Sequence, residues 1–178
     1  MEKLLFLFAA LFLISTMTMA QEKKVDFSGT WTLDVSKSKL DERARIESQV
    51  LTVTQTEKNI KVETATKRTP MPEGYLGGPL RRDMGGDTST TYSLDGKETT
   101  VTVDSQMVSM PVTLKAKFEG SKLSLSQTRT FNGERGEMSM TTKEIWELEA
   151  DGKTLTVTRE STRARGTNSS TMVFVKKS

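Results

Sequence analysis

The stretch Phe27-Ser28-Gly29-Thr30-Trp31-Thr32-Leu33-Asp34-Val35 predicts the first strand of the fold. Within it, Trp31, Leu33 and Val35 alternate with polar residues. Because successive side chains of a β-strand point to opposite faces, this alternation is typical of a strand with one buried face. We therefore expect an antiparallel sheet that begins here and buries the face of these three residues.

Strand signals recur at short intervals through the rest of the chain. With the first strand they give ten candidates, covering residues 27–35, 46–56, 60–64, 88–94, 98–103, 112–118, 122–131, 138–148, 154–161 and 171–176. The pair Asp95-Gly96 favours a tight hairpin between the fourth and fifth candidates, because such a turn needs positive φ angles. This succession of hairpins predicts an all-β fold, an antiparallel up-and-down β-barrel of about 8–10 strands. An immunoglobulin-like sandwich of short strands is the structural alternative.

The triplet Gly29-Thr30-Trp31 resembles the Gly-x-Trp on the first strand of lipocalins and related calycin barrels, where the Trp plugs one barrel end. Together with the following residues, up to Lys37-Ser38-Lys39, it is similar to secreted bacterial lipocalin-like domains. The strand count is closer to the fatty-acid-binding-protein branch. This resemblance favours the barrel over the sandwich. It also implies that an Arg from a late strand covers Trp31, and Arg159 has the matching place in the chain.

Residues 1–20 have the pattern of a secretory signal peptide. A short polar head with Lys3 precedes an apolar run from residue 4 to residue 14, and small residues lead up to Ala20. A run of about a dozen apolar residues is too short for a transmembrane helix, which needs roughly twenty. We expect cleavage after Ala20, an exported protein that is periplasmic or secreted, and one domain over residues 21–178. An uncleaved membrane anchor is the alternative.

The composition excludes several kinds of site. The chain has no cysteine and no histidine, which removes disulfides, His-based catalytic triads and His metal ligands. Its formal net charge is +3, with no basic stripe interleaved with aromatic residues, so nucleic acid is not an expected partner. Acidic residues such as Asp95 and Asp151 lie at turns without the spacing of a calcium loop. We therefore expect no metal and no cofactor.

Residues 67–87 interrupt the regular strand spacing. This segment holds three of the four prolines and five of the twelve glycines, so it is neither a regular strand nor a helix. Tyr75, Leu76 and Leu80 give it apolar groups, which suggests a lid over a barrel mouth. A solvated loop is the alternative interpretation.

Three charged residues share the parity of apolar residues in late strands and are therefore expected to face inward. They are Arg129, Glu144 and Arg159. Burying an unpaired charge is costly, so each needs a partner, water or a ligand. Their apolar and polar neighbours on the same faces include Leu125, Gln127, Met140 and Val157.

We interpret these residues as a binding site for a small hydrophobic or amphipathic molecule in a protein without enzymatic activity. A tail would contact Leu125, Val157 and Met140, and an anionic head would lie near Arg129, since a guanidinium binds carboxylates through two hydrogen bonds. For Arg159 the same role competes with closure of the barrel end, and Glu144 is available to either arginine. Two other functions stay open. One is an interaction module with a filled barrel, and the other is an enzyme that uses carboxylates.

Overall fold

The computed structural model describes residues 24–41, 44–70, 87–104, 109–133 and 136–177. The expected signal peptide and the candidate lid residues Tyr75, Leu76 and Leu80 lie outside the described residues. Within the described ranges no helix is long and apolar enough to span a membrane. The strands are β1 (Gly29–Leu33), β2 (Ile46–Gln55), β3 (Asn59–Arg68), β4 (Thr88–Ser93), β5 (Thr99–Asp104), β6 (Ser109–Glu119), β7 (Lys122–Gly133), β8 (Gly136–Leu148), β9 (Thr154–Arg163) and β10 (Gly166–Lys176).

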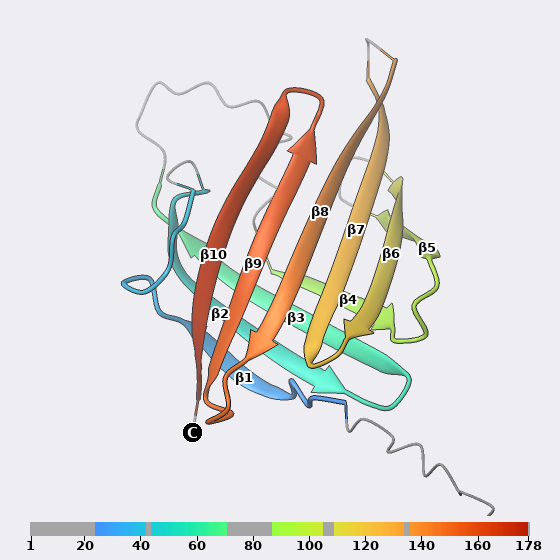
Figure 1. Cartoon of the computed structure of the whole chain (residues 1–178). Coiled ribbons are helices and arrows are strands. Elements are labelled where there is room, and N and C mark those ends of the chain that lie inside the picture. Colours follow the sequence, from blue (N-terminus) through green and yellow to red (C-terminus); the bar gives the residue numbers. More distant parts are fainter. Residues whose placement is uncertain (1–23, 42–43, 71–86, 105–108, 134–135, 178) are drawn as a thin grey trace, which may run out of the picture.

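All ten strands belong to one sheet with the order β4-β3-β2-β1-β10-β9-β8-β7-β6-β5. Each strand is antiparallel to its neighbours, and β1 pairs with both β2 and β10. Strands β5 to β10 form one layer and β1 to β4 cross behind it (Figure 1). The predicted all-β, up-and-down barrel is therefore confirmed. The barrel is nearly closed. It is not fully closed, because β4 and β5 are the two ends of the sheet order and do not pair with each other.

The first strand explains the Gly-x-Trp pattern. Trp31 is fully buried, and its indole Nε1 donates a 2.9 Å hydrogen bond to the carbonyl oxygen of Phe27. A Cβ atom on Gly29 would lie 2.7 Å from Cε of Lys176, so glycine makes room for this lysine stem. The Lys176 Nζ lies 5.1 Å from the centroid of the Trp31 ring. The expected burial of Val35 is wrong: β1 ends at Leu33, a turn follows, and Val35 is exposed.

Aromatic side chains fill the barrel end that contains Trp31. Phe27, just before β1, is fully buried, with its ring centroid 6.3 Å from that of Phe118 and 5.9 Å from that of Trp146. The side-chain amide of Gln55 holds this segment, because its Oε1 accepts from the Phe27 N–H at 3.0 Å. The end of the barrel near Trp31 is therefore closed by packed side chains.

The predicted hairpin between the fourth and fifth strands is wrong. The turn at Asp95-Gly96 exists, and Gly96 has a φ of 77°. However, β4 pairs with β3 and β5 pairs with β6. Leu94 is buried, and its N–H donates to the carbonyl oxygen of Lys58 at 2.7 Å. Because Leu94 is held beside the β2–β3 turn, the chain leaves β4 toward the other layer and does not fold back on it.

The β9–β10 hairpin is longer than predicted. Residues 162–170, which were not assigned to strands, continue the ladder to the pair Arg163 and Gly166. This part of the hairpin is mostly exposed and rich in Ser and Thr, so it lacks the apolar alternation that marks a half-buried strand. Strands β9 and β10 therefore extend well beyond the buried core, and the residues of their inward faces near the hairpin tip are mostly exposed.

Candidate functional site

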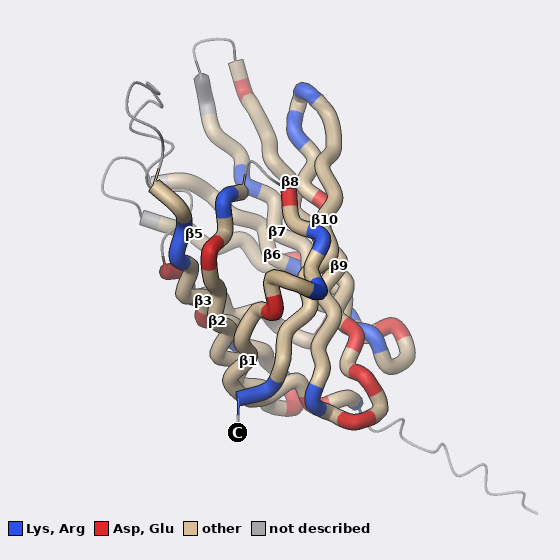
Figure 2. Tube along the Cα trace, turned by 90° about the vertical axis from the view of Figure 1, so that its left-hand side faces the viewer, with Lys and Arg blue, Asp and Glu red and all other residues tan. Residues whose placement is uncertain are grey.

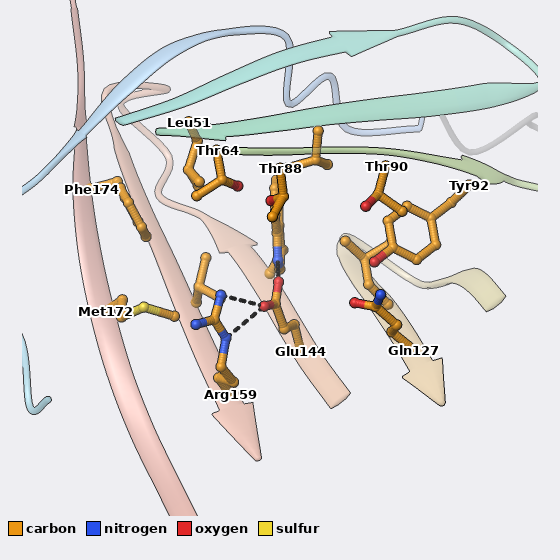
Figure 3. A pocket seen from close by; sticks show the side chains of 14 residues that line it. Leu51, Thr64, Thr88, Thr90, Tyr92, Gln127, Glu144, Arg159, Met172 and Phe174 are labelled. Carbon is orange, nitrogen blue, oxygen red and sulfur yellow. Dashed lines mark hydrogen bonds and ion pairs between the residues drawn. The ribbon is translucent and has the colours of Figure 1, made fainter. Parts of the chain in front are cut away.

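A pocket of about 90 Å³ lies between the two layers of the barrel (Figure 3). Seven strands contribute to its wall. The lining residues are Leu51, Val62, Thr64, Thr88, Thr90, Tyr92, Leu125, Gln127, Glu144, Trp146, Val157, Arg159, Met172 and Phe174. The volume is below the 150 Å³ of a cavity that holds benzene and corresponds to about three water molecules.

The lining divides into an apolar part and a polar part. Leu125, Trp146, Val157 and Phe174 are each at most 2% exposed and belong to the hydrophobic core. Threonine hydroxyls and the side chains of Tyr92, Gln127, Glu144 and Arg159 supply the polar part. One pocket therefore offers both an apolar surface and hydrogen-bonding groups to an occupant.

Glu144 and Arg159 form an ion pair inside the barrel. Glu144 on β8 lies opposite Arg159 on β9, and its Oε1 accepts from both Nε and Nη2 of Arg159 at 2.7 Å. The other carboxylate oxygen, Oε2, accepts from the indole Nε1 of Trp146 at 2.8 Å. Both oxygens of Glu144 are therefore engaged, and the inward charge that strand parity predicted here is neutralised within the protein.

Arg129 has a neutral partner. When the Gln127 amide is oriented with its oxygen toward Arg129, Oε1 accepts from Nε and Nη2 of Arg129 at 3.2 Å each. Arg129 forms no ion pair with any residue in the described ranges. Its guanidinium thus has no described carboxylate as a partner and lies beside Gln127, one of the residues that line the pocket.

Tyr92 supplies a hydroxyl that faces the pocket and has no protein partner among the described residues. Its side chain projects from β4 into the pocket toward Gln127, and the residue is 8% exposed (Figure 3). The hydroxyl makes no hydrogen bond to any described residue. Burial, and then the nearby Glu144 carboxylate, raise the pKa of Tyr92 above its ordinary value near 10. At neutral pH the hydroxyl is therefore protonated and can donate a hydrogen bond to an occupant of the pocket.

The structure brings most of the predicted binding residues together. Leu125, Gln127, Glu144 and Val157 line the pocket. Arg129 and Met140 are not lining residues; they are direct neighbours on β7 and β8, one inward-facing row beyond Gln127.

Arg159 lies elsewhere than expected from the resemblance. It pairs in register with Ser170 on β10, six residues before Lys176, which pairs with Trp31. Six residues along a strand span roughly 20 Å, so Arg159 is out of reach of the Trp31 ring. The cation over Trp31 is Lys176, and Arg159 pairs with Glu144 at the pocket.

Solved structures that resemble the chain include two binding proteins. One is zebrafish ileal bile acid-binding protein in complex with cholic acid, with 15% sequence identity, a TM-score of 0.49, and coverage of 85% of this chain and 98% of that chain. The other is the fatty-acid-binding protein isolated from Manduca sexta, with 12% identity, a TM-score of 0.45, and coverage of 84% and 99%. No protein-family model matches the sequence. A search of curated proteins also gives no match.

Sequence reasoning missed the contribution of β4 to the site. Thr88, Thr90 and Tyr92 all line the pocket. The signal was present, because Tyr92 shares strand parity with Leu94, which is buried. This parity is a weak signal, because residues 88–91 are all Thr or Ser and neither face of the strand stands out as apolar.

The acidic side chains near the pocket are few. The fourteen lining residues, all within the described ranges, include one carboxylate, Glu144. No group of three or more Asp, Glu, His or Cys residues in those ranges is arranged to hold a metal ion. The turn aspartates have local roles, since Asp151 Oδ1 accepts from the N–H of Lys153 at 2.7 Å and Asp95 Oδ1 from the N–H of Lys97 at 2.9 Å.

Proposed function

We propose that this protein binds a small amphipathic molecule in the pocket between the two layers. The observation that carries this proposal is the hydroxyl of Tyr92, which faces the pocket, is protonated and has no protein partner among the described residues. Tyrosines in a protein interior normally direct the hydroxyl to a hydrogen-bond partner. A ligand that accepts a hydrogen bond from Tyr92 would supply this partner.

The size of the pocket limits what enters it. A volume of about 90 Å³ accepts an apolar group of about three or four heavy atoms against Leu125, Val157 and Phe174. The rest of the ligand then extends past Gln127 toward the open end of the barrel. We therefore propose a short or compact apolar tail. A long fatty acid would have to displace core side chains or leave most of its chain outside.

An anionic group on the ligand is best placed between Tyr92 and Arg129. Arg159 is already neutralised by Glu144, whereas Arg129 has only the neutral amide of Gln127. A carboxylate there would accept from the Tyr92 hydroxyl and from the Arg129 guanidinium, and charge-assisted bonds of this kind are stronger than neutral ones. The residues favour an anionic amphipath over a neutral one.

We infer binding without chemical conversion. General acid–base work needs a carboxylate that can gain and lose a proton at the ligand. Glu144 accepts two bonds from Arg159 and one from Trp146, so both of its oxygens are already engaged within the protein. The proposal supports a carrier or sensor of a small molecule.

Export is a separate part of the proposal. It depends on residues 1–20, whose polar head, apolar run and terminal Ala20 fit a signal peptide. N-terminal sequencing of protein recovered from the exporting cell should begin at Gln21. Recovery of the chain with Met1 intact on membranes would contradict this part and leave the pocket unaffected.

The binding proposal is tested by calorimetric titration with butanoate, hexanoate, hexanol and palmitate. We expect hexanoate to bind more tightly than hexanol, and palmitate to gain no affinity over hexanoate. Tyr92→Phe should weaken hexanoate about 13- to 160-fold, the value of one hydrogen bond to a charged group, about 1.5–3 kcal/mol. Thr91→Val is the matched control, because it removes an exposed hydroxyl from the neighbouring position of the same strand. No binding of any of these compounds, or equal losses in both variants, would contradict the proposal.

A further inference from the structure

A row of three side chains crosses the inner face of the large layer just outside the pocket. Arg129 on β7 is paired with Met140 on β8, and Arg163 on β9 reaches the same methionine, with its Nε 3.2 Å from Met140 Sδ. The row lies two residues along β7 from Gln127, which lines the pocket. It therefore begins where a ligand would leave the pocket.

Both arginines in this row lack an acidic partner. Neither Arg129 nor Arg163 forms an ion pair with a residue that the structure describes, whereas the next inward arginine, Arg159, is paired with Glu144. Their contacts are with a neutral amide and with a thioether, which is a weak acceptor. Each guanidinium has five N–H donors, so most of the hydrogen-bonding capacity of the row is unused.

The spacing of the two arginines suits an anion held between them. Their strands are separated by one strand, so their backbones are about 10 Å apart, and the side chain of Arg163 leans toward Met140 between them. Arginine forms two parallel hydrogen bonds to phosphate-like oxygens. A tetrahedral anion has three or four oxygens that can receive such pairs from two sides, whereas the two oxygens of a carboxylate would have to be shared between Arg129 and Arg163.

The surroundings favour the head group of an amphipath. Val101 and Met138, on the inward faces of β5 and β8, are 36% and 37% exposed. The tip of the β9–β10 hairpin carries one further basic residue, Arg165, in its exposed turn (Figure 2). The row is thus a cationic site bordered by apolar side chains that have no cover in the described structure.

We propose that Arg129 and Arg163 clamp a phosphate or sulfate ester head group on the amphipathic ligand whose apolar end occupies the pocket. This inference rests on the proposed function and names the class of its ligand. Arg129 contacts either a carboxylate or a phosphate, and Arg163 adds its main contacts to the larger, more highly charged group, which has oxygens to spare. Arg163 is therefore the residue that selects the head group.

Titrations with hexyl phosphate, hexanoate, hexanol and inorganic phosphate test the clamp in the protein of residues 21–178. The variants are Arg129→Gln, Arg163→Gln and the control Arg165→Gln, which removes the same charge from the exposed hairpin turn. We expect hexyl phosphate to bind at least about fivefold more tightly than hexanoate, and this advantage to shrink with added salt. Arg163→Gln should weaken hexyl phosphate about tenfold and change hexanoate less than twofold, whereas Arg129→Gln should weaken both.

The outcomes separate the clamp from the proposed function. If Arg163→Gln behaves like Arg165→Gln while hexanoate still binds in a Tyr92-dependent way, the clamp is wrong and the pocket stands. If none of the three hexyl compounds binds, both proposals fail. Inorganic phosphate that binds as tightly as hexyl phosphate, and depends on Arg163, would show a site for free phosphate and overturn the head-group assignment. Arg163→Lys should restore part of the lost affinity, because it returns the charge without the two-pronged geometry.

Discussion

Replacing Tyr92 by Phe removes a single oxygen atom from the pocket and should not destabilise the protein. The hydroxyl is in a residue that is 8% exposed and has no partner among the described residues. A hydroxyl that is well bonded within the fold contributes about 0.5–1.5 kcal/mol to stability, whereas one without a protein partner contributes none of this. A pocket of about 90 Å³ has room for water beside the Tyr92 hydroxyl. We therefore expect the free energy of unfolding to stay unchanged or to rise by up to about 1 kcal/mol.

Urea denaturation of the ligand-free protein measures this change. The midpoint should stay constant or increase at constant slope, so that the difference reports on stability and not on the exposed surface. In 10 mM hexanoate the parent protein should gain more stability than Tyr92→Phe, because a ligand stabilises the folded state in proportion to the logarithm of its concentration over Kd. The substitution should thus leave the stability of the ligand-free protein unchanged or raised, while it lowers the affinity for hexanoate.

A loss of more than about 1 kcal/mol in the ligand-free Tyr92→Phe protein would refute this reasoning, because it would mean that the hydroxyl is bonded within the fold. Thr91→Val provides the reference for loss of a hydroxyl on the outer face of β4. If both variants bind hexanoate as the parent does, Tyr92 has no part in recognition.

Three further predictions concern the barrel and the charges of the site. Trp31→Ala should lower the free energy of unfolding by about 3–5 kcal/mol in chemical denaturation, because a fully buried large aromatic leaves a cavity; a loss below 1 kcal/mol would contradict its place in the core. Glu144→Gln should cost about 1–3 kcal/mol and shift the fluorescence of Trp146, because Arg159 loses its counter-charge; an unchanged denaturation midpoint would show that the pair is dispensable. The raised pKa of Tyr92 means that the unfolded chain ionises first, so the contribution of Tyr92 to stability is constant below pH 10 and falls as the pH rises above it. Absorbance at 295 nm and denaturation at pH 9, 10 and 11 test this, and a stability independent of pH across that range would contradict it.

The barrel was predictable from local patterns because the relevant information repeats along the chain. Period-two alternation marks each buried strand, and Asp-Gly or Glu-Gly pairs mark turns between strands. The positive φ values of Gly96, Gly120 and Gly152 confirm these turn positions. Parity then placed Leu125, Gln127, Glu144 and Val157 toward the interior, where they line the pocket.

Pairing between distant strands was less predictable. Whether β4 pairs with β5 depends on where Leu94 docks, which is a contact with the β2–β3 turn more than thirty residues away in sequence. The partner of Arg159 depends on register in the same way, because Glu144 and Arg159 meet only when β8 and β9 are aligned. A resemblance in chain position placed this arginine at the wrong end of the barrel.

The size of the pocket and the role of Tyr92 could not be derived from sequence. A strand of Thr and Ser residues has no strong apolar face, so β4 gave little indication that Thr88, Thr90 and Tyr92 face a cavity. Cavity volume depends on how side chains from seven strands pack together. Sequence parity gives the direction of each side chain but not the space left between them.

The indole N–H resonances of the two tryptophans in a ¹H–¹⁵N NMR titration with hexanoate test the central claim most directly. Trp146 lines the pocket, whereas Trp31 is bonded to Phe27 at the closed end of the barrel and serves as an internal control. Binding in the pocket predicts a saturable shift of the Trp146 resonance, with the Trp31 resonance unchanged. Two resonances that stay in place up to 50 mM hexanoate, or that move together, would contradict the claim that this pocket binds an amphipathic molecule.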